Sequence, residues 1–112
     1  MDLEFANSRL RKRCETFNEA VRTWGQRCAE KLFQRLAELE DSESLAVVAR
    51  LPGARCHELK GTRSGRFAVD LEHPKRLLFS PAGNPRDFME GNAVRLERVT
   101  SVVIEEVVDY HG

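Results

Sequence analysis

Three histidines are the side chains of this sequence best suited to proton transfer, because imidazole gains and loses a proton near neutral pH. His57 lies in a short run of apolar and polar residues, just before a loop rich in glycine, serine and threonine. His111 follows Asp109 and Tyr110 at the end of a β-branched run. The alternatives are structural: a strand histidine held by a neighbour, and a disordered chain end. We interpret His73, which precedes a proline, as an exposed turn residue.

Basic side chains gather in the middle of the chain, where they could neutralise a phosphate. Residues 51–86 carry seven Lys or Arg against three Asp or Glu, although the whole chain has a net charge of zero. Residues 87–112 carry two Arg against six acidic residues. A basic centre beside an acidic end favours a local anion site over a generally basic surface. The basic residues in question are Lys60, Arg63, Arg66 and Arg76. Each one alone is more typical of an ordinary solvated face.

The sequence offers little for metal, cofactor or nucleotide chemistry. It contains no HExxH, no paired-cysteine spacing, no P-loop and no GxGxxG. Cys56 and His57 are adjacent, so in a strand they would point to opposite faces. We therefore expect no metal site and no cofactor.

The three cysteines predict reduced thiols, because an odd number excludes a complete disulfide framework. Cys14 and Cys28 fall on apolar helical stripes, which is typical of buried cysteine. Cys56 could also be a nucleophile with His57 or His111 as its base, and a thiol hydrolase stays open as an alternative.

Helices fill the first half of the predicted fold. Apolar residues spaced by four and three predict a helix that Asn7 or Ser8 caps and Gly25 ends: Leu10, Cys14, Phe17, Val21 and Trp24. A second helix is predicted over residues 26–40, with Cys28, Leu32, Leu36 and Leu39 on one face. The short link makes the two an antiparallel hairpin. We expect Leu10, Phe17 and Trp24 to face the second helix and the sheet. A third, short helix should run through Leu45, Val47 and Val48, capped at residues 41–42.

Strands fill the second half. Leu3 and Phe5 alternate with acidic residues, which indicates a short edge strand. A β-meander should follow, with a short strand around His57, a half-buried strand over residues 67–71 and another strand from Arg76. Residues 80–96 carry prolines and turn residues and predict a long loop. The run at 99–108 predicts a central strand, and the whole chain, residues 1–112, forms one α+β domain.

Membrane and export signals are absent from the sequence. No run approaches the ~18 apolar residues that a spanning helix needs, and residues 1–25 hold no apolar signal-peptide segment. We therefore expect a cytoplasmic protein without a membrane partner.

The sequence resembles the HigB-type toxins of bacterial toxin–antitoxin modules, in the RelE-like group also called proteic killer proteins. The stretches that carry the resemblance are LPGARCHELKGTRSGRFAVDLEHPKRLLFSP and VTSVVIEEVVDYHG, which cover the C-terminal half in order with an unmatched loop between them. The resemblance implies a helical hairpin packed on a curved antiparallel sheet. It implies a ribosome-dependent endoribonuclease that cuts mRNA in the decoding site. Its expected partners are mRNA on the ribosome and a helix-turn-helix antitoxin (HigA-like), with operator DNA bound only through that antitoxin.

The resemblance also implies roles for single residues. Catalytic roles carry over to His57 in HELKG and to Asp109, Tyr110 and His111 in DYH, and phosphate contacts carry over more loosely to Lys60, Arg66 and Arg76. In such a reaction the 2′-hydroxyl of RNA attacks the adjacent phosphate, so the protein supplies only a base, an acid and cations. The neutral net charge motivates an alternative, the same fold acting as a binding module without catalysis.

Overall fold

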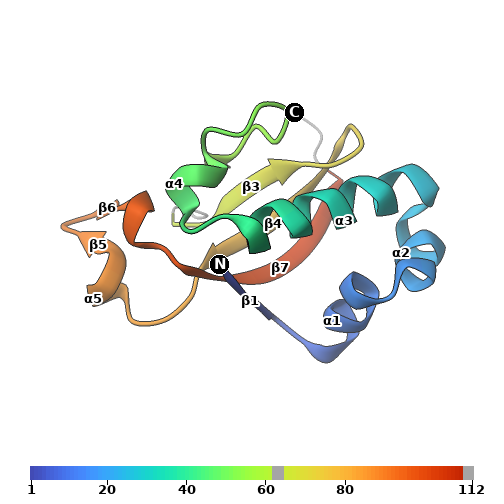
Figure 1. Cartoon of the computed structure of the whole chain (residues 1–112), viewed down its shortest axis with the longest axis horizontal. Coiled ribbons are helices and arrows are strands. Elements are labelled where there is room, and N and C mark those ends of the chain that lie inside the picture. Colours follow the sequence, from blue (N-terminus) through green and yellow to red (C-terminus); the bar gives the residue numbers. More distant parts are fainter. Residues whose placement is uncertain (62–64, 110–112) are drawn as a thin grey trace.

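The computed structural model describes residues 1–61 and 65–109. Its elements follow a helices-then-sheet order, apart from one short strand at the start and two short helical turns between β4 and β7 (Figure 1). The helices are α1 (Ser8–Glu15), α2 (Phe17–Trp24), α3 (Gln26–Asp41), α4 (Leu45–Val48), α5 (Pro85–Phe88) and the 3-10 turn η2 (Leu96–Arg98). The strands are β1 (Asp2–Phe5), β2 (His57–Glu58), β3 (Phe67–Asp70), β4 (Lys75–Pro81), β5 (Met89–Glu90), β6 (Ala93–Val94) and β7 (Ser101–Asp109).

Five strands form the main sheet in the order β1-β7-β4-β3-β2. β2, β3, β4 and β7 pair antiparallel, as predicted, whereas β1 lies parallel to β7. The parallel pair arises because the chain passes through all its early helices and the meander before β7 returns beside β1. β1 is an edge strand and β7 an interior one, which confirms both predictions and the α+β class.

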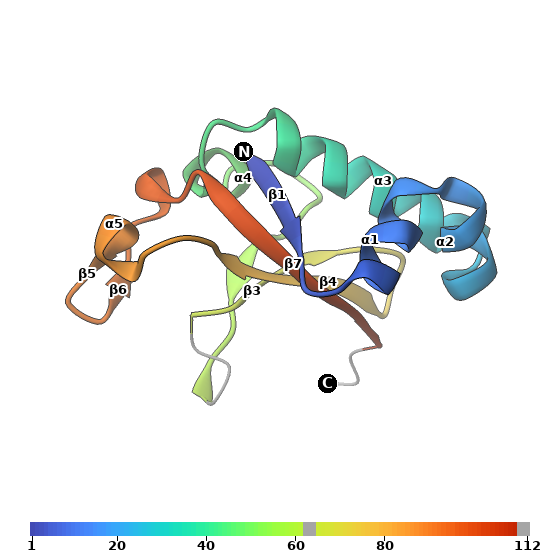
Figure 2. The ribbon, with the colours of Figure 1, turned by 90° about the horizontal axis from the view of Figure 1, so that it is seen from below.

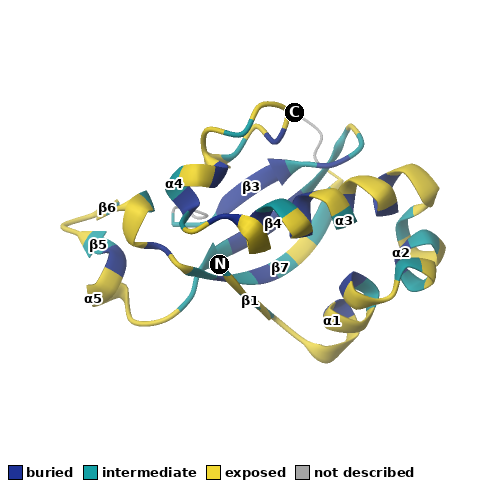
Figure 3. Ribbon diagram, viewed as in Figure 1, coloured by how far each residue is buried: buried dark blue, intermediate teal, exposed yellow. Residues whose placement is uncertain are grey.

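α3 crosses one face of the sheet and builds most of the core (Figures 1 and 2). Its predicted apolar face is buried through Cys28, Leu32, Leu36 and Leu39. The sheet contributes a matching set of buried residues beneath it, Val69, Leu77, Phe79, Val102 and Ile104. Figure 3 shows this buried layer between helix and sheet, while the outward face of α3 is exposed. None of the described helices is long and apolar enough to cross a membrane.

The predicted first helix is two helices, because the chain is extended at Thr16 (φ −122°, ψ 107°). The break turns Phe17 toward α3, where its ring meets the Phe33 ring edge-on at 5.3 Å between centroids. Leu10 is buried, as predicted. Trp24 is only half-buried at the rim of the core, with the Arg13 guanidinium 5.9 Å from its ring centroid.

β3 differs from the predicted half-buried strand, because Phe67, Ala68 and Val69 are all buried. Phe67 and Val69 face the helices. Ala68 faces the other side, where it packs with Leu59 and Leu78 in a second, smaller cluster. The sheet is therefore covered on part of both faces.

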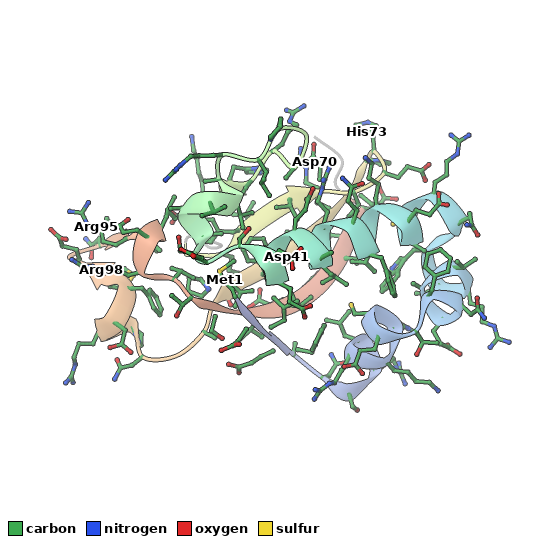
Figure 4. The ribbon with its side chains drawn as sticks, viewed as in Figure 1. Met1, Asp41, Asp70, His73, Arg95 and Arg98 are labelled. Atoms are coloured by element: carbon green, nitrogen blue, oxygen red, sulfur yellow. The ribbon has the colours of Figure 1, made fainter. Side chains whose placement is uncertain are left out.

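The predicted long loop contains ordered structure: α5, a hairpin of β5 and β6, and η2. Asn84 caps α5, with its Oδ1 accepting from the Arg86 amide at 3.0 Å. Glu90 binds Arg95 at 2.7 Å and lies 3.8 Å from Arg98, on the lobe at the left of Figure 4. The cap of α4 was also wrongly predicted. Ser44 precedes that helix, and the Ser42 hydroxyl instead donates to Glu38 O at the end of α3.

Candidate active site

The sheet face turned away from α3 carries the predicted histidine. In an antiparallel sheet, directly opposed residues share a face. The register joins His57 to Ala68, Ala68 to Leu78 and Leu78 to Glu106, so these four side chains form one row across β2, β3, β4 and β7. The ends of the row are exposed and its middle is buried. We call this surface the open face.

His57 is exposed on the edge strand β2, with its Nδ1 2.9 Å from the Arg55 carbonyl oxygen. An Nδ1–H donating to that carbonyl leaves Nε2 as a basic nitrogen with no described partner. A backbone oxygen that fixes the tautomer in this way is a recurring feature of working histidines. Nε2 is then the nitrogen of His57 that can take a proton from a ligand, and the contact at Nδ1 equally fits a strand histidine satisfied by a neighbour.

Asp109 ends β7, is exposed and pairs with Lys75 across the β4–β7 register. Three strand spacings separate β2 from β7, or about 14 Å, and Asp109 lies three residues beyond the His57 row, or about 10 Å. At that separation the Asp109 carboxylate does not reach the His57 ring. Asp109 also points to the other face of the sheet, because its neighbour Val108 packs against the open-face cluster and successive strand residues alternate between faces. Tyr110 and His111 lie outside the described residues.

Arg66 lies on the open face but is paired within the protein. Its Nε is 2.5 Å from Glu105 Oε1, its guanidinium is 3.5 Å from Glu106, and the Ser80 hydroxyl donates to Glu105 Oε2 at 2.9 Å. A β-bulge explains the double contact. Leu78 pairs with Glu106 but the next residue of β4 pairs with Ile104, so Glu105 is the extra residue. A bulge re-aims the extra side chain, and here it sends two successive carboxylates toward one arginine.

The other predicted cations differ in their exposure and in their ion pairs. Lys60 is exposed just beyond β2 and forms no ion pair with a described residue. Arg76 lies on β4, with its Nε 3.4 Å from Asp70 Oδ1. Arg63 falls outside the described residues. Among the described cations, Lys60 therefore has no ion pair with a described residue, whereas Arg66 and Arg76 are paired with carboxylates.

A cavity of about 170 Å³ at the β3–β4 turn holds a cluster that sequence reasoning missed. Its charged lining consists of Arg55, Asp70, His73, Lys75 and Arg76, and we call it the Asp70 pocket. Figure 4 places Asp70 and His73 at the same end of the sheet. His73, interpreted above only as a turn residue, is exposed but belongs to this wall. The available signal was the Lys75-Arg76 pair directly after the turn, and nothing in the sequence places Arg55 beside it.

The cysteine alternative finds no support in the geometry. All three thiols are free, and burial raises the pKa of Cys56 to about 11. A thiol with so high a pKa stays protonated at neutral pH and is a poor nucleophile. No group of three or more potential metal ligands occurs within residues 1–61 and 65–109.

Comparison with known proteins relates the fold to toxin structures. The YoeB/ParE toxin from Agrobacterium tumefaciens matches with a TM-score of 0.60 at 12% identity, over 99% of this chain and 100% of that chain. The YoeB-YefM complex from Staphylococcus aureus matches with a TM-score of 0.55 at 12% identity, over 100% of this chain and 98% of that chain. No protein-family model and no curated protein matches the sequence. At this identity the likeness is one of fold.

Proposed function

We propose that this protein is the toxin of a toxin–antitoxin module in the RelE-like group, of the HigB type, and that it cuts mRNA on the ribosome. The observation that carries the proposal is the end-to-end match of its fold to solved YoeB toxin structures. The HELKG and DYH motifs, recognised from the sequence alone, support the same group. The structural matches share only 12% identity with this chain, so they support the fold, and the motifs support the group.

The chemistry of the proposal needs few groups. His57 Nε2 takes the proton of the RNA 2′-hydroxyl as that oxygen attacks the adjacent phosphate, and the P–O5′ bond breaks. Tyr110 or His111 gives a proton to the departing 5′-oxygen, and Asp109, at the end of β7, orients that acid. Lys60, Arg63 and Arg76 stabilise the charge that develops on the phosphate. The products carry a 2′,3′-cyclic phosphate and a 5′-hydroxyl.

A partner protein is part of the proposal. One matching structure is a complex of YoeB with YefM, which supports a neutralising partner for this chain as well. From the HELKG and DYH motifs of this chain we expect the partner to be a HigA-like helix-turn-helix antitoxin. We expect operator DNA to be bound only through that antitoxin.

A second candidate function is a binding module of the same fold without catalysis. The Arg66 contacts favour it, because Glu105 and Glu106 neutralise a cation that a phosphate-binding site would need. The net charge of zero points the same way.

The test is cleavage of a defined mRNA by purified protein on programmed ribosomes. We expect cleavage only when ribosomes are present, and 5′ ends that require phosphorylation before they can be ligated. His57→Gln should abolish cleavage, whereas Lys12→Ala, an exposed change on α1, should leave it intact. Folded wild-type protein that binds ribosomes without cutting mRNA would instead support the binding module.

A further inference from the structure

The strand β1 leaves one side of the main sheet unpaired. It stands at the end of the strand order and pairs with β7 on one side only. The amides of Asp2 and Ala6 donate across to the β7 segment, at 3.1 and 2.9 Å. Because successive strand residues direct their backbone groups to alternate sides, the N–H and C=O groups of Leu3 and Phe5 point away from β7. Figure 2 looks onto this edge, with β1 in front of β7. A further strand could therefore pair with β1.

A groove of about 350 Å³ lies beside this edge, on the side of the sheet that faces α3. The register joins Leu3 to Val102 and Phe5 to Ile104, which are both buried beneath the helices, so the two β1 side chains face the groove. Both are half-buried. The rest of its apolar lining comes from α1 and α3: Cys14, Phe33, Leu36 and Ala37. We call this surface the β1 groove.

The other side of β1 is acidic. Asp2 and Glu4 alternate with the two groove residues of β1, so their side chains project from the opposite face, and both are exposed. Glu40 is a third exposed carboxylate, at the rim of the groove. These three acids form no ion pair with a described residue. Arg11, also at the rim, is paired with Glu15 at 3.2 Å. The edge therefore has uncompensated negative charge.

Charged residues on an edge strand can serve only to prevent aggregation. That role needs no apolar groove beside the strand, and an apolar surface rimmed by polar residues is typical of an interaction site. A second copy of the chain fits this edge poorly. Two β1 strands side by side would bring Asp2 and Glu4 close to the same carboxylates, and like charges on neighbouring strands are destabilising. The edge instead matches a strand of alternating apolar and basic residues.

We propose that β1 docks an extended segment of a partner protein in which apolar and basic residues alternate. The segment adds a strand to the sheet through the backbone groups of Leu3 and Phe5. Its apolar side chains enter the β1 groove, and its Lys or Arg side chains meet Asp2 and Glu4. β1 and β2 are opposite edges of the sheet. The segment therefore leaves His57 uncovered, and the inference does not rest on the proposed nuclease activity.

The experiment adds a fluorescent peptide of about six residues, the usual length of a strand, with alternating valine and lysine. Anisotropy measures its affinity for the full chain, and NMR measures amide hydrogen exchange with and without the peptide. We expect exchange at the Leu3 and Phe5 amides to slow about ten-fold or more on saturation, while the His57 amide on the opposite edge is unaffected. A peptide of the same composition with its valines and lysines in separate blocks should bind more weakly, because it lacks the alternation.

Two variants test the two faces of the proposed site. Glu4→Lys should weaken binding about five-fold or more, and a peptide with glutamate in place of lysine should recover it, as expected for a cross-strand charge pair. Ala37→Gln, at an exposed position on α3, should weaken binding because the longer side chain fills the groove. Glu30→Lys and Ala93→Gln, at exposed positions outside the groove, are the matched controls.

Peptides methylated on alternate backbone nitrogens test the added strand without any change to the protein. Methylation of the amides that face β1 should abolish binding, whereas methylation of the other set should not. No binding of the alternating peptide, equal binding of both methylated forms, or unchanged exchange at Leu3 and Phe5 in the bound protein would overturn the proposal. Protection of these two amides in the protein alone, lost on dilution, would show that a second copy occupies the edge and would also overturn it.

Discussion

At the scale of single residues, the partner of each cation decides what it can do. Lys60 is exposed without an ion pair to a described residue, so it is available to an incoming phosphate. Arg66 is paired with Glu105 and Glu106, and Ser80 also binds Glu105. The Arg66 guanidinium therefore links the start of β3 to β7, and these ion pairs must break before it can bind a ligand. The sequence predicts both as phosphate contacts, and only their surroundings separate them.

Removal of Arg66 should therefore cost stability as well as binding. Arg66→Ala leaves two adjacent carboxylates without their cation, and we expect the free energy of unfolding to fall by about 2 kcal/mol, as for a hydrogen bond to a charged group. Glu105→Gln in the same chain should recover part of that loss. Urea denaturation of both single variants and the double variant measures the coupling. Additive effects would show that the Arg66–Glu105 contact contributes nothing to the fold.

The cysteines predict how stability depends on alkaline pH. Burial raises the pKa of Cys14 from 9.0 to about 12. Between these values the unfolded thiol has lost its proton while the native one keeps it, so stability present below pH 9 declines as pH rises. The slope is at most about 1.4 kcal/mol per pH unit for each thiol. Denaturation at about pH 8 and about pH 10.5 should show a smaller decline in Cys14→Ala than in the wild type. Equal declines would contradict the burial effect.

At the scale of elements, α3 is the part whose role follows most directly from the sequence. Its one-sided apolar stripe and the glycine before it predict both its position and its buried face. The break at Thr16 is not predictable in that way, because the apolar spacing continues across it. The pair of Arg66 and Glu105 is separated by 39 residues. Its existence depends on a bulge that no local pattern reveals.

Arg35 on α3 donates hydrogen bonds to the backbone carbonyl oxygens of Asp70 and Gly53, and these bonds give a prediction for α3. Arg35→Met retains the apolar length of the side chain but leaves the carbonyl oxygens of Asp70 and Gly53 without their donor. We expect a loss of about 3 kcal/mol, the cost of breaking a buried charged contact. Arg27→Met, on an exposed position of the same helix, should stay within about 0.5 kcal/mol of the wild type. Equal stability of the two variants, measured in urea, would show that the hydrogen bonds of Arg35 do not stabilise the fold.

At the scale of the whole molecule, the sequence predicts the fold better than it predicts the site. The α+β class, the edge strand and the interior β-branched strand follow from period and composition, because these patterns reflect burial directly. The lobe of residues 84–98 does not, since short turns of helix and strand there depend on contacts such as Glu90 with Arg95. The Asp70 pocket was missed for the same reason: its side chains meet only after the β3–β4 turn and the Arg55 loop come together.

The end of the chain offers a prediction at this scale. If His111 acts in catalysis, deletion of residues 111–112 should leave a folded protein that no longer arrests growth. The described core and the last strand end at Asp109, so the loss of these residues should alter the melting temperature little. The melting temperature of the truncated protein checks the prediction on stability, and the growth curve of cells that express it checks the prediction on toxicity. Full toxicity in the truncated protein would remove His111 from the proposed mechanism.

The most direct test of the central claim is induced expression in a bacterium, with growth and the 5′ ends of transcripts measured together. The account predicts that wild-type protein stops growth and creates new 5′-hydroxyl ends within translated regions. The same mRNAs should stay intact when translation initiation is blocked. His57→Gln, expressed at the same level and with the same melting temperature, should do neither. Unimpaired growth with abundant folded wild-type protein, or cleavage that persists in His57→Gln, would contradict the account.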